Sequence, residues 1–145
     1  MKTLKILAAL FFVTGVAVAQ DINPADVPAA VKNAFTKEYA NATDVEWEKE
    51  MENYQVDFDV DRMDHEVWYN ASGTVVKKEQ DIAETTLPQA VRDALKAGYA
   101  DYRLDDIEKV WQNNTTSYQL ELEKGNEDKH VTFDANGKVI AERKH

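Results

Sequence analysis

The feature that most constrains the fold is an internal repeat, in which residues 27–79 are matched in type by residues 87–143. The two stretches align at an offset of 60 through their first third. From Trp47 onward the offset becomes 64, so that Trp47 matches Trp111 and the linker after the second helix is expected to be four residues longer. Because both stretches carry the same pattern, we expect two copies of one structural unit.

Each copy opens with a helical pattern. Apolar side chains recur at the spacing of a single helical stripe: Val27, Val31, Ala34, Phe35 and Tyr39 in the first copy, and Leu87, Val91, Ala94, Leu95 and Tyr99 in the second. Pro28 and Pro88 stand at the start of the two stripes, where a missing N–H costs no hydrogen bond. We therefore expect one amphipathic helix of about three turns in each copy.

After the helix, apolar and polar residues alternate with a period of two. The first copy shows this in Tyr54, Val56, Phe58 and Val60 against Gln55, Asp57, Asp59 and Asp61, and the second in Tyr118, Leu120 and Leu122 against Gln119, Glu121 and Glu123. A period of two is typical of a strand with one buried face and one wet face. The sequence thus predicts antiparallel strands that bury one side only.

Both copies also contain a turn with Asn or Asp at its first position and glycine at its fourth, at residues 70–73 and 134–137. The flanking residues read as the arms of a hairpin. Gly73 and Gly137 are expected to adopt positive φ, which other residues accept only at a cost. With first strands near 44–49 and 106–111, each copy predicts about four antiparallel strands.

The expected fold class is α+β, with two tandem units that each combine a helix with a four-stranded antiparallel sheet. The units span residues 20–82 and 83–145. Because a unit of roughly 60 residues buries little core by itself, we expect the two to form one compact domain. Whether the two half-sheets are continuous is left open by the sequence.

Residues 1–19 have the pattern of a secretory signal peptide: a short basic start, an apolar run over 6–18 and a cleavage site after Ala19. The apolar run is too short to span a membrane, and no cysteine follows the site to carry a lipid anchor. We therefore expect a periplasmic or secreted protein without a stable membrane anchor. The absence of cysteine means that its stability comes from the core and not from disulfides.

Charge limits the class of partner. Removal of the signal peptide would leave 15 basic and 27 acidic side chains, a formal charge of −12. Such a surface repels nucleic acid and anionic lipid. Neutral or cationic partners, or partners that carry bound metal, are favoured instead.

The candidate contact residues are Trp68 and the acidic rows Asp57, Asp59, Glu121 and Glu123. The acidic rows are either a solvated face or a weak cation site, and solvated surface is the commoner explanation. Trp68 alternates with the core-facing Val67 and Tyr69, so it should point to the open side of the sheet. It is then either a contact residue, as tryptophans at interfaces often are, or it is covered by another part of the chain. Trp47 and Trp111 are expected in the core.

The sequence contains no recognised catalytic motif: no Gly-x-Ser-x-Gly, no His-Glu-x-x-His and no glycine-rich phosphate loop. His65 and His130 lack the spacing of a zinc site. We therefore expect no enzymatic activity, no cofactor and no dedicated metal site. Oligomeric state is not predicted.

The recurring residues resemble those of the exported bacterial PepSY-like family. They are Pro28, Tyr54, Asn70 and Gly73 in the first copy, and Pro88, Tyr118, Asp134 and Gly137 in the second. The family is similar in fold to the beta-lactamase inhibitory protein, whose tandem helix-plus-sheet units present a sheet face to an enzyme. The resemblance implies an envelope protein that binds other proteins, with inhibition of a protease or another hydrolase as the usual conjecture.

Two functions from different classes follow. The first is a non-enzymatic periplasmic or secreted module that binds an envelope protein through its open sheet face, as a modulator or inhibitor of a hydrolase or protease. The alternative is a periplasmic protein that binds a cation or a small ligand on the acidic face. Metal titration would distinguish the two.

Overall fold

The computed structural model describes residues 19–144. Its helices are α1 (Ala29–Glu38) and α2 (Gln89–Gly98), each preceded by a 3₁₀ turn, Pro24–Asp26 and Glu84–Thr86. Its strands are β1 (Gln20–Asp21), β2 (Thr43–Glu50), β3 (Asn53–Val60), β4 (Met63–Tyr69), β5 (Val75–Asp81), β6 (Arg103–Gln112), β7 (Thr115–Lys124), β8 (Glu127–Asp134) and β9 (Val139–Lys144). The expected signal peptide lies outside the described residues, apart from Ala19. Among these residues no helix is long and apolar enough to cross a membrane.

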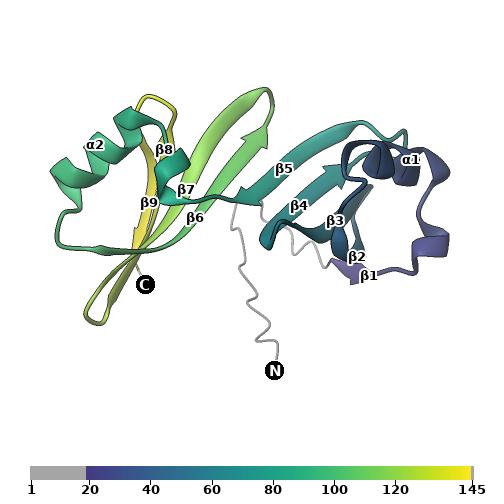
Figure 1. Ribbon diagram of the computed structural model, residues 1–145, viewed down its shortest axis with the longest axis horizontal. Helices are drawn as coiled ribbons and strands as arrows, with labels where there is room; N and C mark the ends of the chain where they lie inside the picture. Colours follow the sequence, from purple (N-terminus) through teal and green to yellow (C-terminus); the bar gives the residue numbers. More distant parts are fainter. Residues whose placement is uncertain (1–18, 145) are drawn as a thin grey trace.

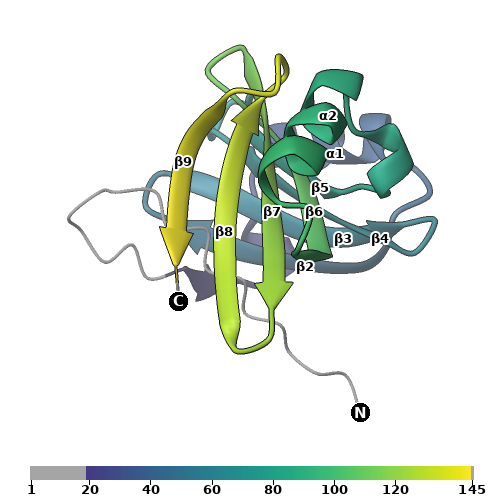
Figure 2. The ribbon, with the colours of Figure 1, turned by 90° about the vertical axis from the view of Figure 1, so that its left-hand side faces the viewer.

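The strands form one antiparallel sheet of nine strands, ordered β1 to β9 as in the sequence. Both helices cover the same side of this sheet, α1 over the first half and α2 over the second (Figures 1 and 2). The α+β class is therefore confirmed. The sheet is nonetheless single and not divided into two four-stranded sheets, because β5 pairs with β6 from Lys77–Gln112 to Asp81–Glu108.

Two apolar clusters hold the helices on the sheet, one beneath each helix. Under α1, the ring of Phe35 meets Trp47 and Phe58 edge to face, with centroids 5.4 and 5.0 Å apart. Under α2, Val91 and Phe133 have no exposed surface. The predicted helical stripes therefore face the sheet, and residues beside the stripes face solvent.

The two predicted turns are confirmed, including the positive φ of their glycines. The φ of Gly73 is 82° and that of Gly137 is 80°. In the first turn the Asn70 side chain accepts hydrogen bonds from the backbone N–H groups of Ser72 and Thr74. Asp134 makes the same pair of bonds in the second turn. Each turn is thus closed by its first side chain, as its sequence indicates.

The proposed match of Trp47 to Trp111 is wrong. Trp47 pairs with Val56, whereas the strand partner of the equivalent Leu120 is Ile107. A second contact agrees, because Ile22 N–H donates to the carbonyl of Trp47 and Ile82 N–H donates to that of Ile107, both at 3.0 Å. The offset of 60 therefore continues through β6, and the two linkers after the helices are equal in length.

The four additional residues of the second copy lie in the β6–β7 hairpin. They add the pairs Trp111–Thr116 and Gln112–Thr115 beyond the point where the first hairpin turns. Side chains of a strand point alternately to its two faces. Two extra residues on each arm therefore leave the remaining side chains of the hairpin on the same faces as in the first copy. Trp111 has the same residue type as Trp47 but belongs to this extension. Trp111 is half-buried and is absent from the cluster under α2, so its expected core position is also wrong.

Candidate binding surfaces

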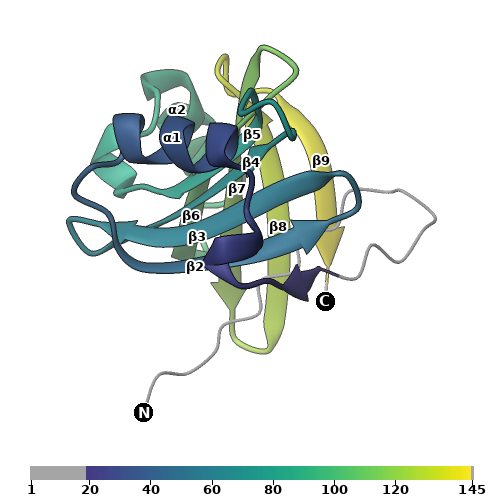
Figure 3. The ribbon, with the colours of Figure 1, turned by 90° about the vertical axis from the view of Figure 1, so that its right-hand side faces the viewer.

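Both helices lie on one side of the sheet (Figure 3), and we call the opposite side, where the acidic residues of the strands point, the open face. In β3, Val56 and Phe58 lie in the core beneath α1, so Asp57 and Asp59 point to the open face. In β7, Leu120 and Leu122 are buried, and Glu121 and Glu123 point the same way. Trp68 joins them because it pairs with Gln55. The five candidate contact residues thus share one face but lie in two groups, on β3–β4 and on β7.

Trp68 contributes little surface to the open face. Its side chain is 7% exposed. The indole Nε1 donates a 2.7 Å hydrogen bond to Oε2 of Glu50, and Nζ of Lys77 lies 4.1 Å from the ring centroid. Neighbouring side chains therefore cover the ring, which corresponds to the second of the two explanations that the sequence left open. The contacts suit a role for Trp68 in holding Lys77 in place.

Three carboxylates that the sequence analysis did not single out fill the middle of the open face. Glu66 on β4 and Glu79 on β5 lie in register beside Asp57 on β3. Glu108 on β6 lies opposite Asp81, two residues along from Val110, which pairs with Glu79. We call Asp57, Glu66, Glu79 and Glu108 the central carboxylates. They share the strand phase of the acidic rows, but only the order of β4, β5 and β6 in the sheet shows that they meet.

Gln55 and Lys77 contact three of the central carboxylates. Nε2 of Gln55 donates to Oδ1 of Asp57 at 3.0 Å and to Oε2 of Glu66 at 3.2 Å. Nζ of Lys77 lies 2.7 Å from Oε1 of Glu79, whose residue is only 5% exposed. The charge of Lys77 also favours the ionised forms of Glu66 and Glu108.

Burial and mutual repulsion shift the pKa values of these groups upward. Burial, followed by the charges of Asp57 and Glu79, raises the pKa of Glu66 to about 8. Burial, followed by Glu79 and Asp106, raises the pKa of Glu108 to about 8. Burial likewise raises the pKa of Asp57. At neutral pH this part of the open face therefore retains protons that an approaching cation would displace.

Two carboxylate triplets could hold a cation. The ligand oxygens lie within 4.8 Å of one another in Asp81, Asp106 and Glu108, and in Asp105, Glu121 and Glu123. In the second triplet, Arg103 forms ion pairs with Asp105 and Glu123 and already supplies a positive charge. An all-oxygen set suits a hard cation such as Ca²⁺, although three side chains are fewer than the six to eight ligands it takes. The first triplet is therefore the better candidate.

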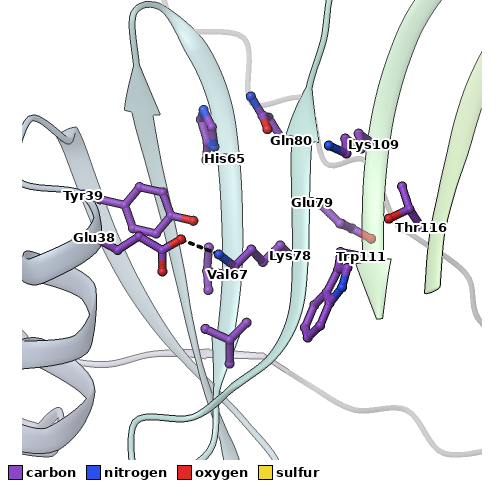
Figure 4. A pocket seen from close by; sticks show the side chains of 11 residues that line it. Glu38, Tyr39, His65, Val67, Lys78, Glu79, Gln80, Lys109, Trp111 and Thr116 are labelled. Carbon is purple, nitrogen blue, oxygen red and sulfur yellow. Dashed lines mark hydrogen bonds and ion pairs between the residues drawn. The ribbon is translucent and has the colours of Figure 1, made fainter. Parts of the chain in front are cut away.

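On the helix side, a hollow of about 540 Å³ lies at the joint between the two halves of the sheet. Tyr39 and the ion pair of Glu38 with Lys78 form the wall near α1, and Trp111 forms part of the opposite wall (Figure 4). His65 lies at the same rim, where burial lowers its pKa. The extension of the β6–β7 hairpin thus supplies Trp111 and Thr116 to the lining of this hollow. The alignment of Trp111 with Trp47 did not predict this position.

Comparison with known proteins identifies the family. Residues 16–65 and 52–141 match the model of the beta-lactamase-inhibitor-like, PepSY-like family. The chain belongs to this family. No curated protein matches the sequence. The PepSY-like resemblance expected from the turn and core residues is therefore confirmed.

Solved structures share the PepSY-like fold. A BLIP-like protein from Bacteroides fragilis is 26% identical, with a TM-score of 0.67 over 81% of this chain and 86% of its own. A protein of a family of unknown function from Bacteroides uniformis is 24% identical, with a TM-score of 0.71 over 81% and 88%. A Bacteroides eggerthii protein, provisionally described as periplasmic, is 23% identical, with a TM-score of 0.73 over 81% and 88%. The last two show the fold alone.

Proposed function

We propose that this PepSY-like protein is a non-enzymatic protein-binding module that docks a cationic surface of its partner on the open face. The observation that carries the proposal is the group of central carboxylates, in which Lys77 lies beside Glu79 and the other three acids lie on β3, β4 and β6. The inhibitor-like family and the BLIP-like structural neighbour support a protein partner.

The charges of the open face also define how binding would depend on pH. A lysine or arginine of the partner placed near Glu66 and Glu108 favours their ionised forms and lowers their raised pKa values. Docking would therefore release protons. Affinity would increase as the pH rises toward about 8, because fewer protons then have to be displaced.

Location and role belong to the same proposal. Cleavage after Ala19 would deliver residues 20–82 and 83–145 to the periplasm or the medium as one compact domain. There the open face would cover the surface of an envelope hydrolase or protease and modulate or inhibit it.

Charge reversal on the open face tests the proposal. A variant with Asp59→Lys and Glu121→Lys is expected to lose at least about tenfold in affinity for a partner captured from an envelope extract, since each reversal opposes a cation. The measurement is quantitative capture followed by titration of the captured protein. We leave Trp68 unchanged because it is buried and its removal would disturb the fold.

The matched control carries the same change in net charge on the helix side. Asp26 and Asp93 are exposed there, and the variant Asp26→Lys with Asp93→Lys should retain the partner. Equal loss in both variants would mean that only net charge matters. Unchanged binding in the open-face variant would show that the partner docks elsewhere.

A second candidate function is cation binding at the first triplet, for which the convergence of Asp81, Asp106 and Glu108 is the supporting observation. If the dissociation constant is about 1 mM, Ca²⁺ at about ten times that concentration would raise the free energy of unfolding by about 1.4 kcal/mol. Thermal unfolding with and without Ca²⁺ measures this. Asp81→Asn should abolish the rise, whereas Asp101→Asn, at an exposed acid outside the triplet, should leave it intact.

A further inference from the structure

One edge of the sheet is available for strand pairing. β9 pairs with β8 along one side, and no strand of the described residues pairs with its other side. All six of its residues are exposed, and Ile140 is 54% exposed. The opposite edge of the sheet is formed by β1, which has only two residues. The outer side of β9, with six residues, is therefore the longer of these two edges.

The internal repeat supplies a template for what this edge can bind. β9 corresponds to β5, because Val75 pairs with Tyr69 as Val139 pairs with the equivalent Phe133. In β5 the corresponding edge is occupied by β6, which pairs with it over five residues. β5 is accordingly half-buried or buried throughout, whereas β9 is fully exposed. We attribute this difference in exposure to β6, which lies beside β5 and has no counterpart beside β9.

The template also gives the register of an added strand. In the β5–β6 joint, Lys78 lies opposite Trp111 and Gln80 lies opposite Lys109. The corresponding positions of β9 are Glu142 and Lys144. In an added strand of this register, the residue that takes the place of Lys109 would therefore lie opposite Lys144, whereas Lys109 itself lies opposite Gln80. An acidic residue at that place would be attracted, and a lysine would be repelled.

We propose that the outer edge of β9 binds an extended segment of another protein by strand addition, with an acidic residue of that segment opposite Lys144. Backbone hydrogen bonds to β9 provide the affinity, and the side chain opposite Lys144 provides selectivity. Burial of Ile140 adds an apolar contribution. This surface is distinct from the open face, so the two proposals stand or fall separately.

Glu142 and Lys144 also make the edge selective in the free protein. Oε1 of Glu142 lies 3.1 Å from Nζ of Lys129, and Oε1 of Glu127 lies 3.3 Å from Nζ of Lys144. Charged residues on an edge strand discourage indiscriminate pairing with other sheets. A partner strand must therefore offer complementary charge in the correct register.

The test uses two peptides that copy β6 (Arg103–Gln112), one with glutamate in place of Lys109 and one with the native lysine. The glutamate peptide is expected to bind at least about tenfold tighter, and to slow hydrogen exchange of the β9 amides measured by NMR. With the protein variant Lys144→Glu, the preference is expected to reverse in favour of the lysine peptide. A purely structural role for Lys144 would not produce such a reversal.

N-methylation of alternate peptide residues is the control for backbone pairing, because it removes N–H donors and keeps the side chains. The methylated glutamate peptide should lose binding. The proposal is overturned if the peptides protect amides of β1 or β2 instead of β9, if neither peptide binds at millimolar concentration, or if methylation has no effect. It is also overturned if the β9 amides are already protected in a dimer of the protein, since a second copy would then occupy the edge.

Discussion

Replacement of Gly137 by alanine is expected to lower the free energy of unfolding by about 3 to 5 kcal/mol, the largest effect that we predict for a single methyl group. Two causes act together. The φ of 80° disfavours any side chain, and a Cβ atom would lie 2.3 Å from the carbonyl oxygen of Ala90 in α2. Since that neighbour is helix backbone, the contact can be relieved only by moving α2 and the turn apart. Urea unfolding measures the loss.

Gly73 and Gly125 provide graded controls. At Gly73 the added Cβ would lie 2.6 Å from the carbonyl oxygen of Ala30, so Gly73→Ala should be nearly as costly. Gly125 has a φ of 64° but no atom within 4 Å of an added Cβ, and Gly125→Ala should cost only about 1 kcal/mol. Equal costs at Gly125 and Gly137 would contradict the close approach of the helices to the turns.

Glu66→Gln and Glu108→Gln are expected to stabilise the protein in alkaline solution. The pKa of each carboxyl rises from 4.5 to about 8 on folding. The folded state therefore binds more protons than the unfolded state, and stability falls as the pH rises from about 4.5 to about 8. A glutamine cannot ionise and avoids this loss. After allowance for solvent screening, we expect a gain of about 2 kcal/mol for each variant near pH 9.

The pH dependence distinguishes this effect from a general change in packing. The gain should be absent near pH 4, should grow between about pH 5 and pH 8, and should then become constant. Urea unfolding across this range measures it. Glu127→Gln is the control, because hydrogen bonds from Tyr102 and Lys144 lower the pKa of that exposed carboxyl and no stabilisation is expected. A gain from Glu66→Gln that is equal at all pH values would contradict the assigned pKa.

Local chemistry made the helices and turns predictable. The helical stripes, the alternation in β3 and β7, and the Asn70 and Asp134 turns each depend on residues close in sequence. The position of the four extra residues does not. A hairpin that grows by two residues per arm keeps its register, so only the pairing of Ile107 with Leu120 reveals where the growth occurred.

The sequence predicted which face of the sheet carries the candidate site, but not all the residues that form it. Alternation placed Asp57 and Glu121 on the correct face, but the central carboxylates meet only across strands. Their raised pKa values depend on burial, which the sequence of one strand does not contain. Trp68 faces the predicted side and is nevertheless covered, because Glu50 and Lys77 reach it from neighbouring strands.

The four-residue extension also bears on the fidelity of folding. Two similar repeats in one chain invite exchange of equivalent strands, so that β5 could pair with β2 in place of β6. Lys77 and Lys78 find their partners Gln112 and Trp111 only on β6, because β2 ends at Glu50, before the equivalent positions. Because β6 is longer than β2, β5 forms two more residue pairs with β6 than it could form with β2. Removal of the extension would leave the two repeats less able to distinguish their own strands.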